Sequence, residues 1–138
     1  MQFEIEIATD GPGLYEFTDA AAHPLRDKGD GLLSLMVRHT SASLLMQENA
    51  DTDVQRDLMA FFEKLVPHSH SPAMSYLTHT AEGPDDMPAH IKASLLPVNL
   101  CIPVRNGRMR LGTWQGLYLF EHRDAPRTRQ VAAHFRAD

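Results

Sequence analysis

The segment from residue 98 to residue 109 constrains the fold of this chain more than any other. Apolar residues alternate with polar ones, as in a β-strand with one buried face, at Val98, Leu100, Ile102 and Val104. Asn106-Gly107 follows closely, and this dipeptide is the strongest short-range signal of a two-residue β-hairpin. The sequence therefore predicts an antiparallel pair of strands, the second of which begins at Arg108.

Further apolar segments extend this predicted sheet. Alternating or continuous apolar residues between turn residues predict strands over residues 2–8, 14–17, 32–37, 117–120 and 130–135. Together with the hairpin they amount to six or seven strands. With two or three helices inserted among them, the predicted fold class is α+β, with an antiparallel β-sandwich-like core.

Three segments have helical signals. An apolar period of three and four residues predicts an amphipathic helix over residues 51–66, with Asn49 or Asp51 as its N-cap. Thr18 can cap a short helix that Pro24 disturbs. Asp86 can cap another that stops at Pro97, and its inward-facing residues are expected to be Ile91 and Leu95.

Length and composition limit the classes of function. A chain of 138 residues with 43% apolar residues is expected to form one domain over residues 1–138. The net charge of −5 argues against a nucleic-acid partner, and no apolar run approaches the ~20 residues that cross a bilayer. The N-terminus does not resemble a signal peptide, so we expect a cytoplasmic protein without a membrane partner.

Cys101 is expected to be buried, and Trp114 either to join the core or to stack on a planar ligand.

Polar residues gather in three clusters at the ends of predicted elements: residues 39–49, residues 79–92 and residues 112–116 with Glu121 beyond them. The second includes EGPDDMPAHIK, whose acidic, basic and imidazole groups lie on a proline-broken turn that favours a polar ligand. His39, His79 and His90 could hold a catalytic zinc ion, although their spacing matches no known signature. Alternatively, each imidazole forms only local hydrogen bonds.

Carboxylates and hydroxyls supply the other candidates. Glu48, Asp86 and Glu121, together with Asp85, are candidates for acid–base catalysis, and at least one of the two aspartates is expected to stabilise a helix start. The hydroxyls of Thr40 and Ser41 could hold a phosphate or only satisfy a turn. The basic cluster of Arg123, Arg127 and Arg129 suits a small anion, unless it is solvated surface charge.

Five blocks in this sequence resemble the YjbQ family (UPF0047), a group of small proteins long described as uncharacterised. The blocks are HTSASL at 39–44, EN at 48–49, EGPDDMPAHIK at 82–92, GTWQG at 112–116 and EHR at 121–123. The resemblance implies an α+β fold, assembly as a homotrimer, and a secondary thiamine-phosphate synthase activity. That reaction joins hydroxymethylpyrimidine pyrophosphate to thiazole phosphate, both phosphorylated metabolites, and releases pyrophosphate.

The resemblance also implies roles for individual residues. Recurrent histidines fall on His39, His79 and His90, which implies a divalent metal, zinc or magnesium, while recurrent acids fall on Glu48 and Glu121. With Asp86, these acids form the catalytic set. The candidate substrate-binding residues are Thr40, Ser41, Asn49, Lys92, Gln115 and Arg129.

One departure and one alternative accompany this interpretation. The family often has an aspartate directly after its second histidine, where this chain has Thr80, so that imidazole lacks the usual orienting group. The alternative is a metal- or anionic-metabolite-binding module with only incidental turnover. The roles of His122 and His134 stay open at this stage.

Overall fold

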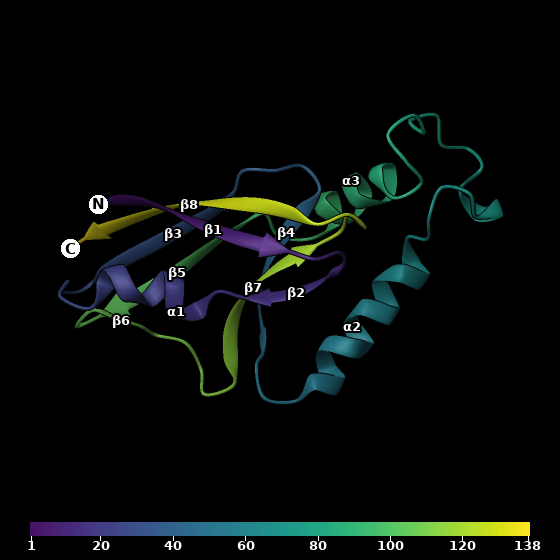
Figure 1. Cartoon of the computed structure of the whole chain (residues 1–138). Coiled ribbons are helices and arrows are strands. Elements are labelled where there is room, and N and C mark those ends of the chain that lie inside the picture. The colour runs from purple at the N-terminus through teal and green to yellow at the C-terminus, as the bar shows by residue number, and fades with distance from the viewer.

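The computed structural model describes all residues from 1 to 138 and contains two antiparallel β-sheets (Figure 1). The larger sheet has the order β1-β8-β3-β5-β6, formed by Gln2–Thr9, Arg127–Ala137, Gly31–Val37, Asn99–Arg105 and Arg108–Met109. The smaller sheet has the order β2-β7-β4, formed by Gly13–Glu16, Gln115–Glu121 and Ala42–Glu48. All the strand pairs are antiparallel.

One apolar core joins the inner faces of the two sheets. Along β5 buried and exposed residues alternate strictly, and β8 is buried at every second residue from Arg129 to Phe135, so each strand presents one face inward. Leu33 and Val131 of the larger sheet belong to the same buried cluster as Leu44 and Leu117 of the smaller one. The predicted α+β class with an antiparallel, sandwich-like core is therefore confirmed.

The predicted hairpin forms between β5 and β6. Asn106 and Gly107 have φ angles of 50° and 72°. A type I′ turn requires two such residues with positive φ at its centre. A Cβ atom on Gly107 would lie 2.5 Å from the backbone oxygen of Leu25, so the turn also requires glycine for space.

Strand β4 was not anticipated from the sequence. Residues 39–49 appear there as a polar cluster, yet Ala42–Glu48 pairs along its whole length with β7. Ala42 lies opposite Glu121, and Glu48 lies opposite Gln115. The polar residues of this block are therefore distributed between the two ends of a strand.

The helices differ from the predictions in their details. Helix α2 is Thr52–Leu65, and its N-cap is Asp51, one of the two predicted candidates, whose carboxylate accepts a hydrogen bond from the Asp53 N–H. Helix α1 is Thr18–Ala22, but the Thr18 hydroxyl accepts from the Leu117 N–H instead of capping the helix. Short 3₁₀ turns occur at His23–Leu25 and Pro72–Met74.

Helix α3, Asp86–Leu95, covers one end of the sandwich. Asp85 occupies its N-cap position, and its buried face includes Ala89 and Ala93. The expectation that Leu95 faces inward is wrong, because Leu95 is 61% exposed. Small alanines let the helix approach β4 closely, whereas a leucine stripe would hold it away.

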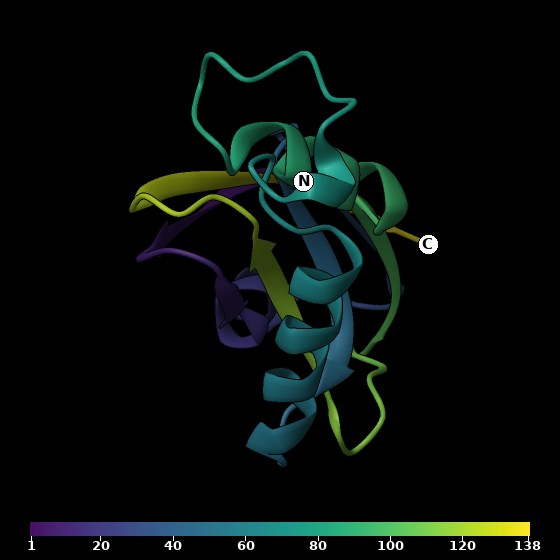
Figure 2. The same cartoon turned by 90° about the vertical axis from the view of Figure 1, so that its right-hand side faces the viewer.

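Helix α2 contacts the sandwich on one side only (Figures 1 and 2): Gln55 donates to the Tyr118 hydroxyl at 3.2 Å, and the rings of Phe62 and Phe120 lie 5.6 Å apart. None of its residues is buried, and Phe61 and Leu65 of its apolar stripe are 57% and 53% exposed. The stripe is present as predicted, but a single copy of the chain covers it only in part.

The expected burial of Cys101 is wrong, and of the two alternatives for Trp114 the core position is excluded. Cys101 is exposed because its strand position places it on the outer face of the larger sheet, between the buried residues Leu100 and Ile102. Trp114 is 63% exposed in the connection before β7. In addition, no helix is long and apolar enough to cross a membrane.

Candidate metal centre

His79, Asp86 and His90 meet at the start of helix α3. The Nε2 atoms of His79 and His90 lie 2.6 Å and 3.2 Å from Oδ2 of Asp86. Asp86 and His90 are four residues apart on the helix and therefore share one face. His79 comes from the preceding loop, and one donor atom from each of the three residues lies within 4.8 Å of the others.

The hydrogen bond at the far side of His90 prepares this imidazole for a cation. Its Nδ1 lies 3.1 Å from the backbone oxygen of Thr40, which can only accept, so Nδ1 carries the proton. In a neutral His90, Nε2 then carries a lone pair, and this lone pair faces the Asp86 carboxylate. Two acceptors face one another stably only with a proton or a metal ion between them, and metal-binding histidines are commonly oriented by such a carbonyl.

Arg123 fixes the carboxylates beside the imidazoles. Its guanidinium donates to Oδ1 of Asp86 and, from Nε, to Oδ2 of Asp85 at 2.7 Å. Oδ2 of Asp86 is thereby left for the histidines. The Asp124 N–H donates to the same Asp85 oxygen at 2.9 Å, so the chain after β7 is tied to the first turn of α3.

These contacts determine the protonation states. Burial alone would raise the pKa of Asp86. The hydrogen bonds with His79 and Glu82 and the nearby charge of Arg123 lower that pKa to about 2. The same hydrogen bond to Asp86 is the main cause that raises the pKa of His79. At neutral pH the cluster therefore contains an ionised carboxylate that attracts positive charge, either a proton or a metal ion.

His39 lies outside this cluster. Its Nε2 accepts a hydrogen bond of 2.9 Å from the Gln130 N–H, and burial, with the nearby charge of Arg129, lowers its pKa. Asp86 instead completes the group of three donors. The structure thus replaces the expected three-histidine set with two histidines and one aspartate.

The contacts of His79 also account for the departure at Thr80. Thr80 is exposed, and Glu82 lies 3.2 Å from Nε2 of His79. Glu82 and Asp86 thus contact the imidazole in the absence of an aspartate at position 80.

A second polar group, around Glu121, is buried in the sandwich. Its carboxylate accepts from Nε of Arg129 at 2.8 Å and from the Thr9 hydroxyl at 2.6 Å. Burial would raise the pKa of Glu121, but the Arg129 contact lowers it below its usual value. Arg129 also donates to Oγ of Ser41 at 2.9 Å. The structure therefore presents Arg129 and Ser41 as partners of Glu121 and of one another, with little surface for a ligand.

Glu48, Asn49 and Gln115 lie at the opposite end of β4 and β7. Six residue steps of ~3.3 Å separate Ala42, beside Glu121, from Glu48, or about 20 Å. Glu48 accepts from the Ala50 N–H, and the side chain of Gln115 accepts from the Gly112 N–H. Within one chain, these three candidates do not join the histidines.

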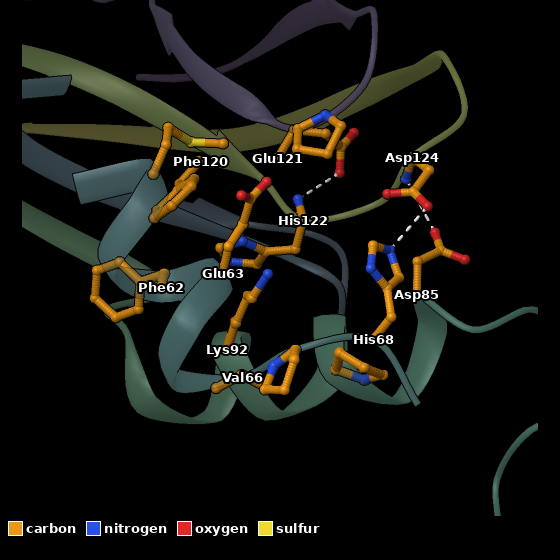
Figure 3. A pocket seen from close by; sticks show the side chains of 14 residues that line it. Phe62, Glu63, Val66, His68, Asp85, Lys92, Phe120, Glu121, His122 and Asp124 are labelled. Atoms are coloured by element: carbon orange, nitrogen blue, oxygen red, sulfur yellow. Dashed lines mark hydrogen bonds and ion pairs between the residues drawn. The ribbon is translucent and has the colours of Figure 1, made fainter. Parts of the chain in front are cut away.

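Lys92 points into a separate pocket of about 300 Å³ between α2, α3 and the end of β7 (Figure 3). Lys92 and His90 are two residues apart, about 200° around the helix, so they occupy nearly opposite faces of α3. Burial lowers the pKa of Lys92. The pocket also contains His122, whose pKa is lowered to about 3, chiefly by burial.

Sequence reasoning underestimated three residues: Glu82, Arg123 and His122. Arg123 and His122 belong to the EHR block, and Glu82 opens the EGPDDMPAHIK block. The sequence signal for their contact is that the EHR block contains the basic Arg123 and the EGPDDMPAHIK block contains acidic residues. Spacing alone does not show that the two blocks meet in space.

The fold and this cluster define a class: small α+β proteins with a candidate cation site of two histidines and one aspartate at the end of a β-sandwich. A family model described as "UPF0047 protein YjbQ-like" matches residues 3–138. The chain therefore belongs to the YjbQ-like UPF0047 family.

Individual relatives support this assignment. UPF0047 protein sll1880 of Synechocystis is 48% identical over 130 residues, which cover 93% of this chain and 86% of that protein. YjbQ of Escherichia coli O157:H7 is 39% identical over 135 residues, covering 96% of this chain and 94% of that protein. The crystal structure of the conserved hypothetical protein TT1486 from Thermus thermophilus has a TM-score of 0.84 and 34% identity, with 97% and 99% of the two chains covered.

Proposed function

We propose that this protein is an enzyme that acts on a small phosphorylated metabolite with the help of a divalent cation held by His79, Asp86 and His90. The observation that carries the proposal is that two imidazoles and an ionised carboxylate lie together, with Nδ1 of His90 facing the Thr40 carbonyl so that its Nε2 faces Asp86. The donor set favours zinc over magnesium, because imidazole nitrogen suits zinc and magnesium prefers oxygen.

The donor atoms fit a metal ion after a small movement. Ligands ~2.1 Å from one zinc ion lie at most ~4 Å apart, and the three donors lie within 4.8 Å of one another. Rotation of the partly exposed His79 ring, which comes from a loop, can close this difference. Three protein ligands would leave a bound zinc ion able to contact substrate or water as well.

The residues around the cluster have complementary roles. A bound cation would supply stabilisation of negative charge on a phosphate or pyrophosphate group. Arg123 holds Asp86 in position, and the Thr40 carbonyl holds His90. Glu82 is exposed beside His79 and can orient or deprotonate a polar group of the substrate, the role expected from the sequence for Glu48 or Glu121.

The particular reaction we propose is secondary thiamine-phosphate synthesis, carried out in the cytoplasm. Joining hydroxymethylpyrimidine pyrophosphate to thiazole phosphate expels pyrophosphate, a strongly charged leaving group. Such chemistry depends mainly on positioning and charge stabilisation, which a cation beside Arg123 can supply. The support is the family resemblance together with this charge distribution.

The test compares metal-free and zinc-loaded protein with both substrates, and measures thiamine phosphate and pyrophosphate. We expect turnover with zinc, and loss of turnover when a chelator removes it. Rates of about 1 s⁻¹ or more would place the reaction in the usual range for enzymes. Zinc binding without pyrophosphate release would reject the enzyme and leave a cation-binding module.

We also propose that the chain functions as a homotrimer whose site lies between subunits. Family motifs lie at both ends of β4, which are about 20 Å apart in one chain: Thr40, whose carbonyl contacts His90 of the histidine cluster, precedes one end, and Glu48 and Asn49 lie at the other. In a trimer, a neighbouring copy can bring its Glu48 and Asn49 close to the histidine cluster. The exposed stripe of α2, which includes Phe61 and Leu65, offers apolar area for that contact.

Replacing the exposed apolar residues of α2 tests the trimer. We expect F61E/L65E to convert a trimer into monomers and to leave the monomer folded, because neither side chain is buried. Light scattering gives the molar mass, and circular dichroism the fold. R56E, on an exposed position of the same helix, is the control that should stay trimeric. A monomeric wild-type protein would contradict the proposal.

A further inference from the structure

The pocket on the other face of α3 contains two hydrogen-bond donors without partners. The Lys92 ammonium has no hydrogen-bond or ion-pair partner in the protein, although its side chain is only partly exposed. His122 is 97% buried, and its Nδ1 has no partner. Figure 3 shows both side chains extending into the same space, from α3 and from the end of β7.

The contacts of His122 indicate which of its nitrogens carries the proton. Its Nε2 lies 2.8 Å from Oγ of Ser43, a fully buried hydroxyl with no other partner. If the Ser43 hydroxyl donates to Nε2, a single group, the Nδ1–H, is left unsatisfied. The opposite tautomer leaves two groups unsatisfied, the Ser43 hydrogen and the Nδ1 lone pair, and each costs free energy in a buried place. Nδ1 is therefore a donor.

The remaining lining selects the ligand. Met59, Phe62, Val66 and Phe120 form an apolar wall, and Phe62 and Phe120 make an edge-to-face pair with ring centroids 5.6 Å apart. Four carboxylates also line the pocket. Asp85, Glu121 and Asp124 contact Arg123, Arg129 and His68, respectively, whereas Glu63 has no ion-pair partner and acts on Lys92 through its charge. This lining repels a dianion more strongly than a monoanion that contacts Lys92. A volume of about 300 Å³ is at the small end of ligand pockets.

We propose that this pocket binds a small monocarboxylate with a compact apolar body. One carboxylate oxygen accepts from the Lys92 ammonium and the other from the Nδ1–H of His122, while the apolar body packs against Phe62 and Phe120. This site is separate from the candidate metal centre and does not depend on the proposed function, because Lys92 and His90 project from nearly opposite faces of α3.

Benzoate is the probe for this site, with benzamide, benzylammonium and phenylphosphate as matched compounds. Titrations followed by backbone amide NMR shifts report both affinity and position. We expect saturable benzoate binding, with shifts at Val66, Phe120 and His122. Benzamide should bind more weakly because it lacks the charge, phenylphosphate more weakly because of Glu63, and benzylammonium should not bind.

Variants of single residues complete the test. K92Q should weaken benzoate binding at least about tenfold, the usual effect of losing a hydrogen bond to a charged group. S43A should weaken it less, since the imidazole is then free to adopt either tautomer. K64Q, an exposed lysine of the same helix as Glu63 but outside the pocket, is the control and should not change it. Equal affinity in K92Q, tighter binding of phenylphosphate, or shifts confined to other parts of the protein would overturn the proposal.

Discussion

Replacing Arg129 by methionine is expected to destabilise the protein by about 3–5 kcal/mol. The substitution leaves the Glu121 carboxylate charged and fully buried, without the guanidinium that now donates to both of its oxygens. Urea unfolding at pH 7 measures the free energy of unfolding. Because the Arg129 contact lowers the pKa of Glu121 in the folded protein, its contribution is present above the unfolded pKa, about 4.5, and is lost as the pH falls.

A second substitution and a surface pair make this prediction specific. Adding E121Q to R129M should recover part of the lost stability, since a neutral amide costs less to bury than a carboxylate. R38M removes the exposed pair of Arg38 with Glu4 and should cost at most about 1 kcal/mol. If R129M unfolds as easily as R38M, the buried ion pair does not have the stabilising role given to it here.

Replacing His90 by alanine is expected to weaken zinc binding by more than ~100-fold. Changes of outer contacts typically cost 10–100-fold, and His90 supplies a donor atom itself. Competition with a chromophoric chelator measures the zinc affinity, and circular dichroism shows whether the variant folds. D86N should have a similar effect, because Oδ2 of Asp86 contacts both imidazoles.

His70 provides the matched control for this experiment. It is exposed and stacks only on His68, so H70A should bind zinc as the wild-type protein does. Equal losses in H70A and H90A would indicate binding to scattered surface imidazoles. Unchanged affinity in H90A would exclude the proposed centre.

The fold was predictable wherever the pattern was local. The alternation in β5 and the Asn106-Gly107 turn need only neighbouring residues, and both predictions are confirmed. Strand β4 was missed because its apolar residues, Leu44 to Met46, form a short run with no alternation between polar blocks. The exposure of α2 was not predictable, since an apolar stripe does not say which surface covers it.

The candidate site was predictable only in part, because it combines local and distant contacts. Asp86 and His90 share a helix face, which their spacing alone indicates. The position of His79 depends on how its loop returns to that helix, and no spacing rule gives that. His39 comes directly before β4, but the hydrogen bond from the Gln130 N–H turns its ring toward β8.

Arg123 places the two sides of helix α3 under a common constraint. Its guanidinium holds Asp85, which lines the pocket of Lys92, and Asp86, which contacts the histidines. If a metal ion at the histidines changes the affinity of the Lys92 pocket for its monocarboxylate ligand, that ligand changes the affinity for the metal ion by the same factor, because linkage between two binding equilibria is reciprocal. The start of α3 is thus the segment through which binding of a metal ion and binding of a monocarboxylate would be coupled.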